Sequence, residues 1–369
     1  MTNAAKAVPA QLGTAPGPAG PLGRPQEAAE ARVAESHPFV TVIIPARNEA
    51  PRIGECLQAL NRGTYPKDRL EILVLDGESD DGTPGVVMDF AAAGLPVRVV
   101  NNPRRSRCAA LNLGISMARG EVIMRIDARN YVPPDYISRC VRTLLSTDAW
   151  NVGGVLRALY KNVTQQAIGL AMSHPFGVGN AQFRLGRRAG DVDTIYLGCF
   201  RREVFSRVGL FDDDAPVLSE DTDMNQRIHD SGGKLYLNPE IDVFYYPRET
   251  MQDLAKLYFR YGGARAGNLL KHGKLTSVRQ LVPLAFVTGT LAAGMLAPLS
   301  AWFLAMFAAS TGLYLAVNAA VSVYFGIRHK GLSLIPRLLV AFPCMHFCWT
   351  FGFFRRIAQG RGHTRHWGY

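Results

Sequence analysis

A stretch of 46 residues without a charged side chain, 281–326, constrains this chain more than any other feature. A helix needs about 20 apolar residues to cross the hydrocarbon core of a bilayer. The stretch is therefore long enough for two passes, and we predict membrane helices at 281–299 and 302–326, with a turn near Pro298. The sequence thus predicts a membrane protein.

A third apolar segment, 338–354, is shorter and contains Pro343 and His346. Its length fits either a third span or an interfacial or re-entrant segment. Basic residues lie on both sides of it, and such residues favour the cytoplasmic side of a membrane. We therefore predict that region 332–354 associates with the membrane without crossing it, and that the chain ends in a basic tail at 355–369.

The basic residues are concentrated at the C-terminal end of the chain. No Asp or Glu follows Asp253, whereas 13 Lys and Arg do; the 41 basic residues of the chain less these 13 leave 28 before that point, against 30 acidic residues. Basic residues beside apolar spans indicate anionic lipid and phosphate ligands, and we predict no nucleic-acid partner. The segment 251–280, with Leu254, Leu257 and Tyr258 at helical spacing, is predicted to be an amphipathic helix on the membrane surface. The alternative is a helix whose apolar face packs on the protein.

The N-terminal region and the cysteines exclude several classes of protein. Residues 1–37 are rich in Ala, Pro and Gly and lack the apolar core of a signal peptide, so we predict a disordered tail. The six cysteines form neither a CxxC pair nor a zinc spacing. They are predicted to be reduced thiols of a cytoplasmic domain.

Strand-like and helical patterns alternate in the region between the tail and the membrane segments. We predict strands at 39–44, 71–75, 97–100, 121–126 and 152–156, and helices at 50–60, 83–93, 108–118 and 134–146. Short connections of this kind predict an α/β domain, here 38–250, with a doubly wound, mostly parallel sheet. The part from 150 to 247 is less regular, with one helix predicted at 222–231. Ligands of such sheets bind at the carboxyl ends of the strands.

Three acidic motifs carry candidate chemistry. Asp76 follows a predicted strand in VLDGESDDGT (74–83), Asp127 follows another in RIDARN (125–130), and Asp221 lies in LSEDTD (218–223) before a helix. A nucleotide-sugar transferase needs groups that hold the nucleoside, neutralise a diphosphate and take a proton from an acceptor hydroxyl. The alternative for the last cluster is ordinary charge matching at a helix start. No GxGxxG motif follows the first strand, which argues against a dinucleotide-binding fold.

In their order along the chain, these motifs resemble family 2 glycosyltransferases, whose catalytic domain has the GT-A nucleotide-diphosphosugar transferase fold. Within the family the sequence is most similar to the succinoglycan-type enzymes of bacterial exopolysaccharide synthesis. The resemblance covers about residues 38–265. It is carried by PARNE (45–49), DGESDDGT (76–83), AALNLGI (109–115), RIDA (125–128), FRREVFSRVGLFD (200–212), SEDTDMNQRI (219–228) and FRYGGARA (259–266).

The resemblance implies a role for each motif. Asp221 would be the catalytic base, with Glu220 and Gly198 near the acceptor. Asp127 would contact ribose, a metal ion or both. The other implied donor-binding residues are Pro45, Ala46, Glu49 and Asp76 for the uridine, and Arg260 and Arg265 for the diphosphate. The alternative for the two arginines is attraction to lipid headgroups.

Two departures from the family pattern refine this expectation. The Asp-x-Asp metal motif is Asp127-Ala128-Arg129 here, so a cation replaces the usual metal ligand. Mg²⁺ or Mn²⁺ is thereby put in doubt as a cofactor, and our hypothesis is that Arg129 partly takes over neutralisation of the diphosphate. The Gln-x-x-Arg-Trp motif of processive synthases is missing, and no apolar span precedes the predicted domain. One sugar per encounter is therefore expected.

The sequence thus predicts an inverting, non-processive glycosyltransferase at the cytoplasmic membrane, with its catalytic domain on the cytoplasmic side. It would move a sugar from a nucleotide-diphosphate donor, a UDP-hexose by resemblance, to a lipid-linked saccharide in exopolysaccharide or envelope glycan synthesis. Two alternatives remain open: a synthase that loads a sugar onto polyprenyl phosphate, and a catalytically degenerate membrane scaffold of a polysaccharide assembly complex.

Overall fold

The computed structural model describes residues 37–213, 219–274 and 277–360. The predicted disordered tail, apart from His37, lies outside the described residues, and so does the 361–369 part of the predicted basic tail.

The first half of the α/β domain contains a parallel sheet, as predicted. Its strands are β1 (Val40–Ala46), β2 (Leu70–Asp76), β3 (Val97–Asn101) and β4 (Val122–Arg125). β1 pairs in parallel with β2 and β4, and β2 pairs in parallel with β3. β1, β2 and β4 are mostly apolar because strands of such sheets are covered on both faces, whereas β3 at the sheet edge is partly exposed. The carboxyl ends of β1 and β4 therefore lie side by side.

The second half of the sheet is mixed, which the sequence did not predict. The strand order is β3-β2-β1-β4-β8-β6-β9-β5, with β7 beside β9. β8 is antiparallel to both its neighbours, and β6 runs parallel to β9. The pairing of β6 with β9 shifts between Gly153 and Val155, opposite the part of β9 that contains Pro239. The bounds are β5 (Asn130–Tyr131), β6 (Asn151–Ala158), β7 (Gly190–Asp191), β8 (Cys199–Arg201) and β9 (Leu235–Tyr245).

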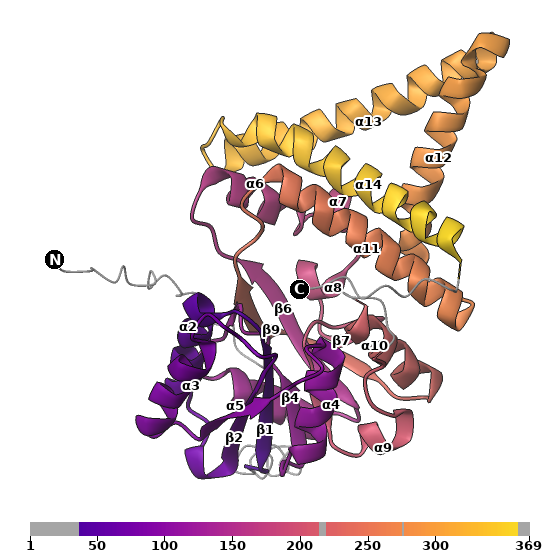
Figure 1. The fold of residues 1–369 in the computed structure, drawn as a ribbon. Coiled ribbons are helices and arrows are strands. Elements are labelled where there is room, and N and C mark those ends of the chain that lie inside the picture. Colours follow the sequence, from indigo (N-terminus) through magenta and orange to yellow (C-terminus); the bar gives the residue numbers. More distant parts are fainter. Residues whose placement is uncertain (1–36, 214–218, 275–276, 361–369) are drawn as a thin grey trace, which may run out of the picture. The chain divides into compact units, whose positions relative to one another are not determined.

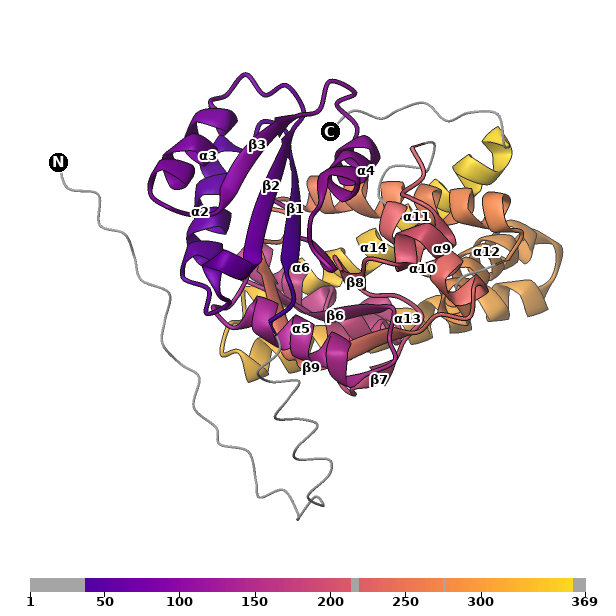
Figure 2. The ribbon, with the colours of Figure 1, turned by 90° about the horizontal axis from the view of Figure 1, so that it is seen from below.

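Helices cover both faces of the sheet (Figures 1 and 2). Alternate residues of β1 enter two cores: Val42 and Ile44 face one, and Ile43 faces the other. The first core is completed by α2 (Ala50–Asn61), α3 (Thr83–Ala92) and α5 (Tyr136–Ser146). The second is completed by α4 (Arg107–Met117), α9 (Val204–Val208) and α10 (Glu220–Asp230). A 3₁₀ turn, η1 (Lys67–Arg69), precedes β2.

Three C-terminal helices are long and apolar enough to cross a membrane. They are α12 (Leu281–Leu296), which continues into η3 (Ala297–Leu299), α13 (Ala301–Arg328) and α14 (Leu334–Gln359). The first two agree with the predicted spans. The third is longer than the predicted segment 338–354 at both ends and contains Pro343 within the helix. Its length is sufficient for a span, and the prediction from the flanking basic residues that it does not cross stays a prediction.

Helix α11 (Met251–His272) runs along α14 and joins the catalytic domain to the membrane helices (Figure 1). Their backbones touch: a Cβ placed at Gly262 would lie 1.8 Å from the carbonyl oxygen of Trp349, and one at Gly352 would lie 1.9 Å from that of Phe259. The two glycines are thus required for this packing.

The apolar face of α11 is buried against protein. Leu254, Leu257 and Tyr258 pack in one cluster with Phe342 and Met345 of α14. The prediction of a helix here is correct, but these side chains contact α14 and do not themselves face lipid.

Three short helices lie between β6 and β8 in the chain. α6 (Val163–Ala171) and α7 (Pro175–Val178) contact α14, and α8 (Gln182–Leu185) packs on β6. His346 of α14 connects this region to α13, because its Nε2 is 2.8 Å from the carbonyl oxygen of Phe176 and its Nδ1 is 2.9 Å from the hydroxyl of Tyr314. A further 3₁₀ turn, η2 (Val278–Gln280), precedes α12.

Candidate active site

A cavity of about 1610 Å³ extends from the carboxyl ends of β1 and β4 to side chains of α12, α13 and α14. Most of the residues proposed from the sequence line it, although they come from distant parts of the chain. They are Pro45, Glu49, Asp127, Arg129, Glu220, Asp221, Arg260 and Arg265. Asp127 and Asp221, which the sequence places nearly a hundred positions apart, thus share one cavity.

Three predicted site residues, all described by the structure, do not line this cavity: Ala46, Asp76 and Gly198. Ala46 is buried in β1. The Asp76 carboxylate accepts hydrogen bonds from the backbone N–H of Ser79 at 3.0 Å and from its hydroxyl at 2.6 Å, so it shapes the turn after β2. Gly198 has φ +131° and accepts a hydrogen bond from the backbone N–H of Arg125 at 3.0 Å. In this conformation these residues support the backbone of the site.

A buried arginine joins the two acidic motifs. Arg125, the last residue of β4, donates from Nε to Asp127 Oδ1 at 2.9 Å and from Nη2 to Glu220 Oε1 at 3.0 Å. The side chains of Arg125 and Glu220 are each only 5% exposed. Arg107, at the start of α4, adds a second donor to Glu220 Oε1 at 3.0 Å. Burial alone would raise the pKa of Asp127, but Arg125 and Arg107 lower it below its usual value, and the same arginines lower the pKa of Glu220.

Asp221 differs from its neighbour Glu220 in its electrostatic surroundings. Its pKa is raised because burial and the Glu220 charge outweigh Arg125 and Arg265. Its Oδ1 accepts a hydrogen bond from the backbone N–H of Thr222 at 2.7 Å, and Arg265 donates to the Thr222 hydroxyl. Of the two adjacent carboxylates that face the cavity, Asp221 therefore has the higher affinity for a proton.

The residues around Asp127 do not fit a divalent cation. Such ions take several oxygen ligands, usually with more than one carboxylate. Both Asp127 oxygens accept hydrogen bonds from Arg125, at 2.9 and 3.3 Å, and Arg129 stands where the second acidic ligand would be. Arg129 itself donates a hydrogen bond from Nε to Glu49 Oε1 at 2.6 Å. Among the described residues there is no group of three or more His, Cys, Asp or Glu able to hold a metal.

Sequence reasoning missed three residues of this network: Arg107, Arg125 and Tyr196. The Tyr196 hydroxyl is 3.4 Å from Asp127 Oδ2 and 3.1 Å from Asn130 Oδ1. Arg125 did give a signal, because a charged residue in the otherwise apolar strand VIMRI needs a buried partner. The partner, Glu220, is 95 positions away and is found only in the fold.

The comparisons agree with this architecture. The family model for glycosyl transferase family 2 matches residues 41–209. The chain is 28% identical over 322 residues to the succinoglycan biosynthesis protein ExoA of Rhizobium meliloti, covering 87% of this chain and 95% of that protein. It is 24% identical over 335 residues to the dolichyl N-acetyl-α-D-glucosaminyl phosphate 3-β-D-2,3-diacetamido-2,3-dideoxy-β-D-glucuronosyltransferase of Methanococcus voltae, covering 87% of this chain and 98% of that protein.

A solved structure has the same fold. The mannosyltransferase PcManGT from Pyrobaculum calidifontis, determined with GDP-mannose and Mn²⁺, matches with a TM-score of 0.60 at 22% identity, covering 90% of this chain and 94% of that one. The predicted GT-A fold with membrane helices after it is therefore confirmed. Residues 41–209 match the glycosyl transferase family 2 model, and this domain, the similar glycosyltransferases and the shared fold support a glycosyltransferase.

Proposed function

We propose that this protein is an inverting, non-processive glycosyltransferase that moves a hexose from a UDP-sugar to a lipid-linked saccharide in exopolysaccharide or envelope glycan synthesis. The observation that carries the proposal is the continuity of one cavity from Asp127 and Asp221 to apolar side chains of the membrane helices. A water-soluble acceptor would not need a cavity lined by apolar side chains of these helices. Relatives support it, since their names include a dolichyl-linked phosphate and undecaprenyl phosphate as substrates. We place the catalytic domain on the cytoplasmic side of the inner membrane, because the chain after Asp253 is basic.

The reaction is a single displacement. A carboxylate oxygen of Asp221 takes the proton of the acceptor hydroxyl, the hydroxyl oxygen attacks the anomeric carbon, and the bond from that carbon to the diphosphate breaks. The electron pair leaves with the nucleoside diphosphate. One displacement inverts the anomeric centre, so an α-linked donor gives a β-glycoside.

Arginines neutralise the leaving diphosphate in this proposal. Arg107, Arg125 and Arg129 line the cavity on the side of Asp127. Guanidinium groups make forked, charge-assisted hydrogen bonds to phosphate oxygens, and fixed donors of this kind stabilise charge that develops on a leaving group. Asp127 is then a ribose ligand held in place by Arg125.

A panel of nucleotide sugars tests the function. We expect the full-length protein in membranes to release UDP from one UDP-hexose when a lipid-linked sugar is present, and to release little with polyprenyl phosphate alone. Released nucleotide and a radiolabelled lipid product are the readouts. Product formed on polyprenyl phosphate would assign the synthase activity instead. No turnover of any nucleotide sugar with either acceptor would leave the scaffold as the correct description.

A chelator tests the role of the arginines. We expect excess EDTA to leave UDP affinity and transfer within about twofold of the untreated values, because three guanidinium groups supply the positive charge. Titration calorimetry measures the affinity without turnover. Loss of UDP binding in EDTA that Mn²⁺ restores would contradict the expectation and would assign a metal to Asp127.

A further inference from the structure

A buried arginine on the membrane side of the cavity forms no ion pair with any described residue. Arg184 of α8 is 9% exposed and lines the cavity. Its Nη1 donates to the hydroxyl of Tyr245 at 3.3 Å, and its guanidinium lies 5.3 Å from the centre of the Phe183 ring. None of the described residues offers it a carboxylate within ion-pair distance. A guanidinium stays charged in proteins, and a buried charge without a partner is costly. The arrangement therefore points to an anionic ligand.

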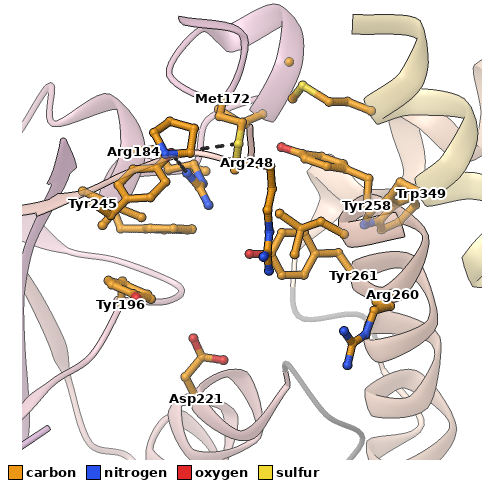
Figure 3. A pocket seen from close by; sticks show the side chains of 18 of the residues that line it. Met172, Arg184, Tyr196, Asp221, Tyr245, Arg248, Tyr258, Arg260, Tyr261 and Trp349 are labelled. Carbon is orange, nitrogen blue, oxygen red and sulfur yellow. Dashed lines mark hydrogen bonds between the residues drawn. The ribbon is translucent and has the colours of Figure 1, made fainter. Parts of the chain in front are cut away.

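Two more arginines point into the same space. Figure 3 shows Arg248 and Arg260 directed, with Arg184, toward the open centre of the cavity above Asp221. In the part of the chain that the structure describes, neither Arg248 nor Arg260 forms an ion pair. The pKa of Arg260 is lowered by burial and by the charges of Arg248 and Arg107. Arg248 and Arg260 thus repel each other, and an anion between them would relieve this repulsion.

The acidic residues nearby do not neutralise this cluster. Glu249 and Asp253 also line the cavity. Asp253 is already held at the start of α11, where it accepts a hydrogen bond from the Thr250 hydroxyl at 2.8 Å and lies 3.8 Å from Lys256. Glu249 is exposed. The positive charge of the cluster faces the cavity.

The cavity wall beyond the arginines is apolar and comes from the candidate membrane helices. It includes Phe286 of α12, Leu313 and Val317 of α13, and Met345 and Trp349 of α14. A ligand that fills both parts has an anionic head and a hydrocarbon tail. A free phosphate compound would leave this apolar surface unused.

We infer that Arg184, Arg248 and Arg260 bind the phosphate or diphosphate that links the acceptor sugar to its lipid, with the lipid tail among α12, α13 and α14. The inference rests on the proposed function, because it takes the acceptor to be lipid-linked. The sequence analysis assigned Arg260 to the donor diphosphate, whereas this inference assigns it to the phosphate of the acceptor. The acceptor sugar, attached to the bound phosphate, then reaches toward Asp221.

Binding to short probes tests this without turnover. The full-length protein in lipid nanodiscs is titrated with farnesyl diphosphate, farnesol, inorganic diphosphate and UDP, and binding is followed by the fluorescence of tryptophan, since Trp349 lines the cavity. We expect the wild type to bind farnesyl diphosphate at least about tenfold more tightly than farnesol or inorganic diphosphate, because only the first has both head and tail. UDP should not displace it.

Variants assign the effect to the arginines. Arg184→Gln and Arg248→Gln are each expected to weaken farnesyl diphosphate binding about tenfold while farnesol and UDP binding stay unchanged, and Arg184→Lys should retain part of the affinity. Arg328→Gln is the matched control, since Arg328 lies at the end of α13 and donates to Tyr324 at 2.8 Å, outside the cavity lining. If Arg184→Gln misfolds and therefore also loses UDP binding, farnesyl diphosphate binding by Arg248→Gln tests the inference, because Arg248 is exposed.

Three results would overturn the inference. They are equal affinity for farnesyl diphosphate and farnesol, displacement of the probe by UDP, and tight binding of inorganic diphosphate alone. The second would return the arginines to the donor site, and the third would assign the site to a soluble phosphate compound. Failure of the proposed transferase reaction with every nucleotide sugar is a separate result, because the binding comparison does not depend on catalysis.

Discussion

Asp221→Asn is expected to reduce transfer by about 10²–10⁴-fold, because an amide cannot take the proton of the acceptor hydroxyl. UDP affinity should stay within about twofold, since Asp221 acts on the acceptor and its loss appears in the chemical step. The measurements are the turnover number for labelled lipid product and calorimetric titration with UDP. Turnover retained at the wild-type level would remove Asp221 from the role of base.

The stability of the same variant separates catalysis from misfolding. In the described part of the chain Asp221 forms no ion pair, and burial and the Glu220 charge both oppose its ionised form. Replacing it with a neutral isostere should therefore leave the melting temperature unchanged or raise it. Asp230→Asn, at the other end of α10 where Asp230 pairs with Lys274 at 2.6 Å, is the control and should keep normal turnover.

The pH profile gives an independent signature of this base. A carboxylate is a base only when deprotonated, so the rate falls as the pH drops through the pKa of Asp221. That pKa is raised by burial and by Glu220, and the acidic limb of kcat/KM should therefore lie above the ordinary carboxyl value of about 4. Any residual activity of Asp221→Asn should lack this limb.

Arg125→Met is expected to lower the free energy of unfolding by about 3–5 kcal/mol, because it leaves the buried carboxylate of Glu220 and the partner carboxylate of Asp127 without their shared cation. Donor binding should weaken as well, since Arg125 orients Asp127. Thermal or denaturant unfolding in detergent measures the first effect, and UDP titration at low temperature measures the second.

The control for this variant is Arg139→Met, which breaks an exposed ion pair on α5. Arg139 and Asp135 are 42% and 41% exposed, so the change should cost less than about 1 kcal/mol. Adding Asp127→Asn to Arg125→Met should recover part of the lost stability, because Asp127 has no other ion pair among the described residues and its unpaired charge is then removed. Equal melting temperatures for Arg125→Met and Arg139→Met would contradict the proposed bridging role.

The parts of the fold that were predicted correctly are those whose local pattern decides their structure. β1, β2 and β4 are buried on both faces and therefore appear as largely apolar runs. β8 was missed because it has only three residues and owes its existence to its neighbours β4 and β6. β9 was missed because its Pro239 is typical of a turn.

The candidate site was predicted less completely than the fold. Asp127 and Asp221 were found because each belongs to a recognisable motif. Arg184 was not predicted, because its lack of a carboxylate partner among the described residues is evident only in the fold. The same holds for Gly198, whose unusual φ and close neighbours have a structural cause that the sequence does not reveal.

The contact of the α11 and α14 backbones through Gly262 and Gly352 has a consequence for how far the enzyme can reach. If a flexible linker joined the catalytic domain to the membrane helices, the domain could reach sugars at any height above the bilayer. Here the helix that supplies Arg260 is in direct backbone contact with a candidate membrane helix, so the reacting centre keeps a fixed working distance from the lipid. Under the proposed function, this fixed distance favours acceptors whose sugar lies close to the lipid.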